Sequence, residues 1–196
     1  MKIKRFTAGI LESNGYVIYQ RDGGECYVID PGYKPSNFID FIGDHNLKLK
    51  GILLTHGHID HVGAVNRVKA ACPCSIYLHR LDADNCRREA DIHMEDGDVF
   101  MLEDEEIKVI HTPGHTKGGV CFFSDKSKAV FTGDTLFDDD VGRTDLEGGS
   151  DRELEETMRS IINCWGNDIT IYPGHGESLG MKKVRKQNRE FLAIIE

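Results

Sequence analysis

The chain has 196 residues, of which 39% are hydrophobic, and its 33 acidic side chains outnumber the 24 basic ones, for a net charge of −9. This length favours a single domain over residues 1–196. The acidic balance disfavours nucleic acid as a partner, since phosphates are bound by a basic face. No apolar run approaches the ~20 residues of a membrane span, and residues 1–6 lack the apolar core of a signal peptide. We therefore expect a cytoplasmic protein without a membrane partner.

In the first half of the chain, a series of strands comes first, and helices then alternate with further strands. Strands are predicted at residues 2–8, 16–20, 25–30, 49–55 and 75–78, with a hairpin turn at 22–24. Helices are predicted at residues 36–44, 60–71 and 80–89, and Asp60 is a candidate cap of the second.

The second half repeats this order. Strands are predicted at residues 99–102, 107–111, 120–124, 129–132 and 169–172, with a hairpin turn at 125–128. Helices are predicted at 151–164 and 181–195, and Ser150 is expected to cap the first of them with Glu153 completing a capping box. Two sheet halves that face each other would produce this repetition.

The six cysteines are scattered and give no zinc-ribbon pattern, because Cys72-Pro73-Cys74 is not a C-x-x-C pair. We expect free thiols in a reducing compartment and none of them as a nucleophile. Cys121 lies in an apolar strand and is predicted to be a core residue. The full set is Cys26, Cys72, Cys74, Cys86, Cys121 and Cys164.

A cluster of metal-ligand side chains follows the strand predicted at 49–55. Residues 55–61 read Thr-His-Gly-His-Ile-Asp-His, with three imidazoles and one carboxylate within six residues. His56 and His58 project to the same side of an extended backbone, and Gly57 lets the chain bend. These ligand types suit zinc, iron or manganese far better than calcium or magnesium. A solvated turn is the ordinary alternative, but four such residues behind a buried strand argue against it.

Three later strands each end in a glycine-marked turn with one more ligand-type residue, as a rigid scaffold would present them. The candidate metal ligands are then His56, His58, Asp60, His61, His115, Asp134 and His175. Seven ligands exceed the roughly four of one tetrahedral zinc ion. They suit two metals about 3.5–4 Å apart, with a hydroxide between the ions. An aspartate should bridge them, because a carboxylate has two oxygens to share.

These motifs, in this order, resemble the metallo-β-lactamase-fold hydrolases over nearly the whole chain. The resemblance implies an α/β (α+β) fold, a four-layer αββα sandwich of two mixed β-sheets flanked by helices, with the metals at one edge. It also implies a ligand set: His56, His58 and His115 for the first metal, Asp60, His61 and His175 for the second, and Asp134 between them.

Within that family, residues 131–137 and 142–145 are similar to the compact, single-domain members of the glyoxalase II (hydroxyacylglutathione hydrolase) group. The resemblance implies hydrolysis of hydroxyacyl thioesters of the S-lactoylglutathione type by a metal-bridging hydroxide. Two divalent ions are implied, zinc first, with iron or manganese as alternatives. Asp60 and Asp134 are the candidate catalytic residues, as acceptors of a hydrogen bond from the hydroxide. Antibiotic hydrolysis ranks lower, because Asp134 is the bridging residue expected of glyoxalase II.

Two departures from that group concern the substrate. Full-length glyoxalase II enzymes carry a C-terminal helical domain that contacts glutathione, and we expect no such domain here. Residues 138–140 are three aspartates, which would repel an anionic substrate. Arg143 and Lys182 are the candidate substrate contacts. The ordinary interpretations are an ion pair with Asp145 for the arginine and a solvated helical face for the lysine.

Other polar residues have plainer interpretations. Asp30 is either a turn aspartate or, as the family implies, a group that orients a metal ligand, and the sequence favours neither. His111 is predicted to be structural, because its turn already supplies His115. The remaining residues are predicted to lie on the surface, in the core or in loops: His45, His79, His93, Thr116 and Thr132.

Two rival functions stay open. Persulfide dioxygenases of the same fold use one iron held by two histidines and one aspartate, and they keep these motifs in sequence. Residues 173–176 look more like those of a hydrolase. An electron-transfer role would need a flavodoxin-like partner domain. Metal analysis and a panel of thioesters and persulfides would separate these functions, whereas the sequence does not indicate the oligomeric state.

Overall fold

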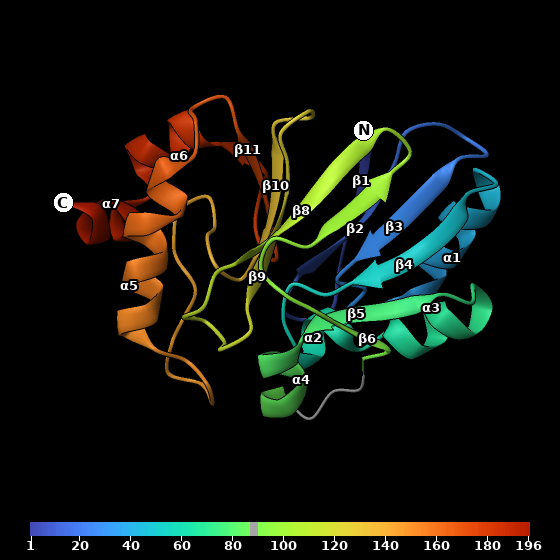
Figure 1. The fold of residues 1–196 in the computed structure, drawn as a ribbon, viewed down its shortest axis with the longest axis horizontal. Helices are drawn as coiled ribbons and strands as arrows, with labels where there is room; N and C mark the ends of the chain where they lie inside the picture. Colours follow the sequence, from blue (N-terminus) through green and yellow to red (C-terminus); the bar gives the residue numbers. More distant parts are fainter. Residues whose placement is uncertain (87–89) are drawn as a thin grey trace.

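The computed structural model describes residues 1–86 and 90–196, with side chains at 1–84 and 90–196, and contains two six-stranded mixed sheets that pack face to face (Figure 1). The strands of the first sheet lie in chain order, antiparallel up to the third and parallel from there on. They are β1 (Lys2–Ala8), β2 (Ser13–Tyr19), β3 (Glu25–Ile29), β4 (Lys48–Leu53), β5 (Ser75–His79) and β6 (Ile92–Met94). The second sheet consists of β7 (Val99–Leu102), β8 (Glu105–His111), β9 (Val120–Ser124), β10 (Ala129–Gly133), β11 (Thr170–Pro173) and β12 (Leu179–Gly180).

Helices cover the outer faces of both sheets (Figure 1). On the side of the first sheet are α1 (Pro35–Asp44), α2 (Ile59–Val62), α3 (Val65–Ala71) and α4 (Arg80–Cys86). On the side of the second sheet are α5 (Asp151–Ser160), a 3-10 turn at Ile162–Cys164, α6 (Met181–Gln187) and α7 (Arg189–Ile195). Among the described residues, every helix is too short or too polar to cross a lipid bilayer.

Three apolar cores hold these four layers together, and β2 shows how the sequence builds them. Its side chains alternate: Tyr16 and Ile18 enter the core between the two sheets, and Val17 enters the core under α1 and α3. Both faces of the strand are therefore buried, as expected for a central layer. The third core lies between the second sheet and α5 to α7, and the buried Cys121 belongs to it. The αββα sandwich predicted from the sequence is confirmed.

Several element boundaries differ from the prediction. The helix predicted at 60–71 breaks after Val62, where the Ala64 amide donates to the carbonyl of Pro31 at 2.9 Å. Asp60 lies inside α2 and does not cap it, which corrects the sequence-based expectation. The helix predicted at 181–195 breaks at Asn188, whose side chain caps α7 through the amide of Phe191. Strands β6 and β12 are too short, at three and two residues, to give a sequence pattern.

Ser150 caps α5 as predicted, by accepting a hydrogen bond from the amide of Glu153. The reciprocal half of the capping box is different, since the Ser150 amide donates to the carbonyl of Gly114 at 2.8 Å. The helix predicted at 80–89 extends to Cys86, and its last three residues lie outside the described part. The five cysteines with described side chains are free thiols.

Candidate metal centre

The seven predicted ligands meet at one edge of the sandwich, where loops from both sheets converge. The loop after β4 and the short α2 carry four of them, and the loops after β8, β10 and β11 carry one each. In that order they are His56, His58, Asp60 and His61, then His115, Asp134 and His175. Their side chains form two groups, which we call the three-histidine group (His56, His58, His115) and the mixed group (Asp60, His61, His175).

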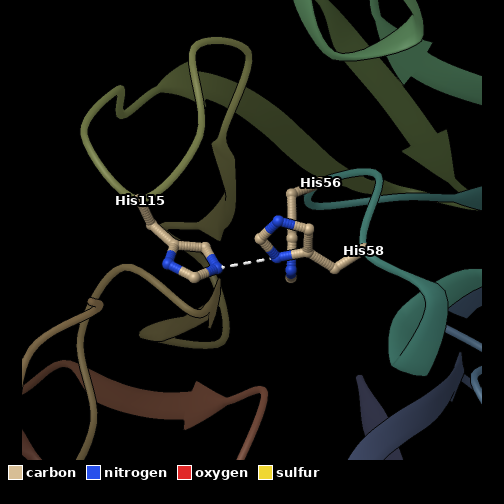
Figure 2. Close-up of side chains that lie close together, drawn as sticks. All are labelled: His56, His58 and His115. Carbon is tan, nitrogen blue, oxygen red and sulfur yellow. Dashed lines mark hydrogen bonds between the residues drawn. The ribbon is translucent and has the colours of Figure 1, made fainter. Parts of the chain in front are cut away.

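The three-histidine group joins the first and second sheets (Figure 2). His56 and His58 lie on the loop after β4, and His115 reaches them from the loop between β8 and β9. The Nε2 atom of His115 lies 3.0 Å from Nδ1 of His58. The rings of His56 and His115 lie 5.1 Å apart, nearly perpendicular, with both side chains almost fully buried. All three ligand-type nitrogens lie within 4.8 Å of one another.

The mixed group is equally close. The Nε2 atoms of His61 and His175 lie 3.4 Å apart. The carboxylate of Asp60 lies 3.5 Å from Nε2 of His61 and 3.2 Å from Nε2 of His175. His61 is fully buried, whereas the side chain of His175 is 26% exposed.

Asp134 lies between the two groups. Its Oδ2 atom is 3.6 Å from Nε2 of His115 and 3.5 Å from Nε2 of His175, and its Oδ1 atom is 3.3 Å from Nε2 of His61. His56 is farther from this carboxylate, at 4.0 Å. One carboxylate therefore faces nitrogens of both groups, as a bridging ligand must.

The donor set fits transition-metal ions. Bonds of about 2.0–2.2 Å at tetrahedral or right angles put two ligand atoms of one ion roughly 3–3.6 Å apart, which is the spacing of most pairs here. In addition, Nε2 of His56 and Oδ1 of Asp134 are buried without a hydrogen-bond partner. A buried polar atom without a partner is costly, and a metal ion is the partner that both atoms suit.

Contacts behind the rings select the nitrogens that face the centre. Nδ1 of His115 donates to the carbonyl of Arg143 at 2.7 Å, and Nδ1 of His175 donates to the carbonyl of Leu11 at 2.8 Å. Nδ1 of His61 donates to the carboxylate of Asp30 at 3.1 Å. Each bond fixes the proton on Nδ1 and leaves the Nε2 lone pair for a metal, as in known metal sites.

The contact with His61 supports the orienting role that the family resemblance implied for Asp30, which also lies in a turn conformation with a φ of +48°. Its two carboxylate oxygens also accept from the amide of Thr55 at 2.8 Å and from the Thr55 hydroxyl at 2.5 Å. Asp30, His56 and His61 have the spacing of a third ligand group. Because the oxygens of Asp30 are already engaged by these donors, we assign it to positioning His61 and the loop after β4.

Asp82, at the first turn of α4, is the functional residue that sequence reasoning missed. Its fully buried carboxylate accepts from the amide of Gly57 at 2.8 Å, from the hydroxyl of Thr116 at 3.0 Å and from the amide of Gly118 at 2.6 Å. It thus ties the loop that carries His56 and His58 to the loop that carries His115. No local motif marks it, because polar residues Asp84 and Asn85 follow within three positions and give Asp82 no distinct sequence signal.

Gly174 allows the close packing around the bridge. A Cβ atom at this position would lie 2.1 Å from Oδ1 of Asp134 and 2.6 Å from the ring of His61. Only glycine lets the backbone before His175 approach so closely. The glycine-marked turn recognised in the sequence therefore has a direct steric reason.

The pKa shifts differ between the two ligand groups. Burial lowers the pKa of His56 well below its usual value and also lowers that of His58. Burial acts in the same direction on His61 and His175, but the carboxylate of Asp134 and its neighbours outweigh it, so that the pKa of His61 is raised well above normal and that of His175 to about 9. Burial opposes ionisation of Asp134, yet the facing histidines hold its pKa well below the usual range.

A cavity of 520 Å³ opens over this centre, and five of the seven ligands line it. Arg143 also lines it, but its guanidinium makes two 2.7 Å contacts with the carboxylate of Asp145. Lys182 is exposed on α6 and is not among the described residues that line the cavity. Of the three aspartates at 138–140, Asp140 lines the cavity.

The remaining histidines are outside the centre. His111 stacks on the buried His79 at 4.5 Å and contacts the carbonyl of Lys117, a structural role as predicted. His45 pairs with Asp22 near the surface, and His93 is exposed. Thr116 and Thr132 are buried and bond within their loops, to Asp82 and to the carbonyl of Leu136.

A two-sheet sandwich with a histidine and aspartate cluster at its loop-bearing edge defines a class of metal-dependent proteins. Residues 8–175 match the Metallo-beta-lactamase superfamily, and the chain belongs to that family.

Individual relatives agree with this assignment. A hydroxyacylglutathione hydrolase of Francisella tularensis subsp. novicida is 35% identical, over 92% of this chain and 69% of its own. The crystal structure of BLEG-1, described as a B3 metallo-beta-lactamase, superposes with a TM-score of 0.87 at 28% identity, covering 96% of this chain and 98% of its own. TTHA1623, solved in a di-iron-bound form, has a TM-score of 0.84 at 29% identity, covering 95% and 98%.

Proposed function

We propose that this protein is a hydrolase of acyl thioesters that uses two divalent metal ions, with hydroxyacyl thioesters such as S-lactoylglutathione as reference substrates. The observation that carries the proposal is the position of Asp134, whose Oδ2 atom lies within 3.6 Å of His115 and of His175. One carboxylate shared by two ligand groups is the arrangement of a two-metal hydrolase. The hydroxyacylglutathione hydrolase of Francisella tularensis supports the thioester as substrate.

Bound ions would supply a hydroxide nucleophile at neutral pH and polarise the thioester carbonyl. In this proposal the three-histidine group would hold one ion, the mixed group would hold the other, and Asp134 would be shared by both. Asp60 lines the cavity beside the mixed group, where its carboxylate would accept a hydrogen bond from a hydroxide nucleophile. Zinc is the first choice, and the di-iron form of TTHA1623 supports iron as the alternative.

The cavity lining suits this chemistry. Among the described residues that line it, none is a serine, threonine, cysteine, lysine or tyrosine, and every aspartate and histidine other than Asp140 is a predicted metal ligand. A thiolate is a good leaving group and needs no strong general acid. Hydrolysis by hydroxide therefore needs neither a covalent nucleophile nor a strong general acid from the cavity lining.

Metal analysis and a substrate panel test the proposal. Protein purified without chelator should contain near two equivalents of transition metal and should release thiol from a thioester, measured with a thiol reagent. A β-lactam belongs in the panel because of the description of BLEG-1. One equivalent of iron, with oxygen uptake on glutathione persulfide and no thiol released from any thioester, would replace the proposal by a persulfide dioxygenase. A cytoplasmic location and a single domain stay predictions.

A further inference from the structure

The mouth of the cavity over the metal centre has an unusual concentration of exposed apolar side chains. Leu11 is 60% exposed, Ile59 is 58% exposed and Leu146 is 41% exposed, and all three line the same cavity. Phe137 and Val141 complete its apolar lining. Single exposed leucines are ordinary, but apolar residues gathered around one concave site mark a binding surface.

These side chains come from separate parts of the chain. Leu11 lies in the turn between β1 and β2, Ile59 is the first residue of α2, and Leu146 lies in the loop between β10 and α5. Elements of both sheets thus present an apolar residue to the same opening. The conformation of a single loop therefore does not explain why these three apolar side chains line one cavity.

Among the described residues of the lining, the one cation outside the predicted metal ligands is already paired with an anion. Apart from the metal ligands, the described lining contains one basic residue, Arg143, and one acidic residue, Asp140. Both guanidinium contacts of Arg143 go to Asp145 at 2.7 Å, so this cation is already paired with a carboxylate. Glutathione carries two carboxylates on its thiol arm, and among the described lining residues nothing pairs with them.

We propose that the cavity selects thioesters whose acyl chain and thiol arm are apolar and uncharged next to the carbonyl, and that it discriminates against the anionic glutathione arm. This proposal rests on the thioester hydrolase function. In the reaction, the oxygen of water bonds to the carbonyl carbon and the carbon–sulfur bond breaks. The products are a carboxylate, a free thiol and one proton. Ions held by the metal ligands would supply the nucleophile for this step, while Leu11, Ile59 and Leu146 hold the apolar parts of the substrate.

The test compares two carriers with the same acyl chain on the metal-loaded protein. Hexanoyl and lactoyl thioesters of N-acetylcysteamine, which is uncharged, are measured against the same thioesters of glutathione. We expect kcat/KM for hexanoyl-N-acetylcysteamine to exceed that for hexanoylglutathione by tenfold or more, and hexanoyl to exceed lactoyl on the uncharged carrier. Preference for the glutathione thioesters would overturn the substrate class and leave the hydrolase function intact.

Binding of thioether analogues, which cannot be hydrolysed, separates this inference from the hydrolase function. Calorimetry should show tighter binding of S-hexyl-N-acetylcysteamine than of S-hexylglutathione. If binding shows this order and no thioester is hydrolysed, the hydrolase function fails alone. If S-hexylglutathione binds more tightly, the apolar selection fails.

Two variants test the residues. Leu146→Lys should lower kcat/KM for hexanoyl-N-acetylcysteamine about tenfold, whereas Val99→Lys, at an equally exposed position of β7 outside the cavity, should leave it unchanged. Asp145→Asn should free Arg143 and raise kcat/KM for the glutathione thioesters several-fold, with little effect on the uncharged carrier. Equal behaviour of the two lysine variants, or no change of carrier preference in Asp145→Asn, would contradict the proposal.

Discussion

The two ligand groups of the metal centre differ in the contacts that support their ligand side chains. Each group has two buried members and one partly exposed member, His58 in the three-histidine group and His175 in the mixed group. The buried Asp82 holds the loop that carries His58, whereas His175 is held by the carbonyl of Leu11, in a turn whose side chains face solvent. Supporting contacts set the affinity of a metal site as much as the ligands do. The two ions should therefore be held with unequal strength.

The largest effect should come from removing the residue that both groups share. Asp134→Ala leaves two cations without a common anion, so one ion is lost, and the mixed group should lose it first. Turnover should fall by several orders of magnitude while the fold survives, because Asp134 follows β10 and does not belong to it. Elemental analysis and thiol release decide this, with Asp139→Ala in the same loop as the control. Two retained ions with near-parent activity would show that Asp134 is not the bridge.

The second prediction is that the metal affinities of the two ligand groups depend differently on pH. His175 has a pKa of about 9 in the metal-free protein, so below pH 9 an ion must displace its proton. His61 of the same group also has a raised pKa and must lose a proton too, so affinity of the mixed group should fall by more than about tenfold per pH unit from pH 9 to pH 7, over roughly 100-fold in all. The lowered pKa values of His56 and His58 leave these rings neutral at pH 7, so affinity of the three-histidine group should stay nearly constant over this range. Calorimetric titration of each ion against pH measures both slopes, and parallel slopes would refute the division.

Asp82→Asn should weaken the three-histidine group alone. An amide in place of the carboxylate turns an NH₂ group toward one of the three donors that Asp82 accepts from. We expect metal affinity of this group to fall about 10- to 100-fold and the free energy of unfolding to fall by about 2–4 kcal/mol. Chelator competition and denaturant unfolding measure these quantities. Asp84→Asn, on the exposed face of the same helix, is the matched control and should change neither.

Gly9→Ala should weaken the mixed group by a smaller factor. Gly9 has a φ of +83°, and a Cβ there would lie 2.3 Å from the ring of Tyr33, so the turn that carries the Leu11 carbonyl must shift. We expect the affinity of the mixed group to fall several-fold. Gly23→Ala has a similar φ of +73° with open space around it, and should cost about 1–2 kcal/mol of stability without changing metal affinity. Equal metal affinities in the two variants would show that the turn at Gly9 does not support the metal centre.

The smallest effect should come from Cys121→Ala, in the core beside the second sheet. The side chain is fully buried and its thiol contacts the Thr112 hydroxyl at 3.4 Å. The substitution should cost about 1 kcal/mol of packing stability. Metal content and turnover should match the parent protein. A loss of activity without loss of stability would assign the thiol a function that its place in the core does not suggest.

The sandwich was predicted from the resemblance of the motifs to the metallo-β-lactamase fold, and the candidate ligands stood out because each lies in a strong local pattern. The loop at 55–61 and the glycine-marked turns at 115, 134 and 175 each follow an apolar strand, and the structure brings them together. Asp82 escaped prediction because its partners, Gly57 and Gly118, are brought to it only by tertiary packing. Asp30 stayed ambiguous for the same reason, since its contact with His61 spans 31 residues.

The predicted helix boundaries were wrong where tertiary contacts override local helix propensity. The helix predicted at 60–71 breaks because the Ala64 amide finds the carbonyl of Pro31, which no periodicity in the sequence records. The helix predicted at 181–195 breaks because Asn188 binds the carbonyls of Phe137 and Asp140 with its side-chain amide. At Ala64 a long-range hydrogen bond replaces a helical one, whereas at Asn188 the backbone amide keeps its helical bond to the carbonyl of Val184 and the side chain also caps the next helix.

The division of the ligands between the two sheets has a consequence for assembly. The first ninety-four residues supply four ligands and the remainder supplies three, and each group takes members from both parts. Each ion would thus act as a cross-link between two halves of one polypeptide. If the backbone were cut between β6 and β7, the two pieces would have to meet before either group was complete. The extent to which the two pieces reassociate would then depend on the concentration of free metal ion.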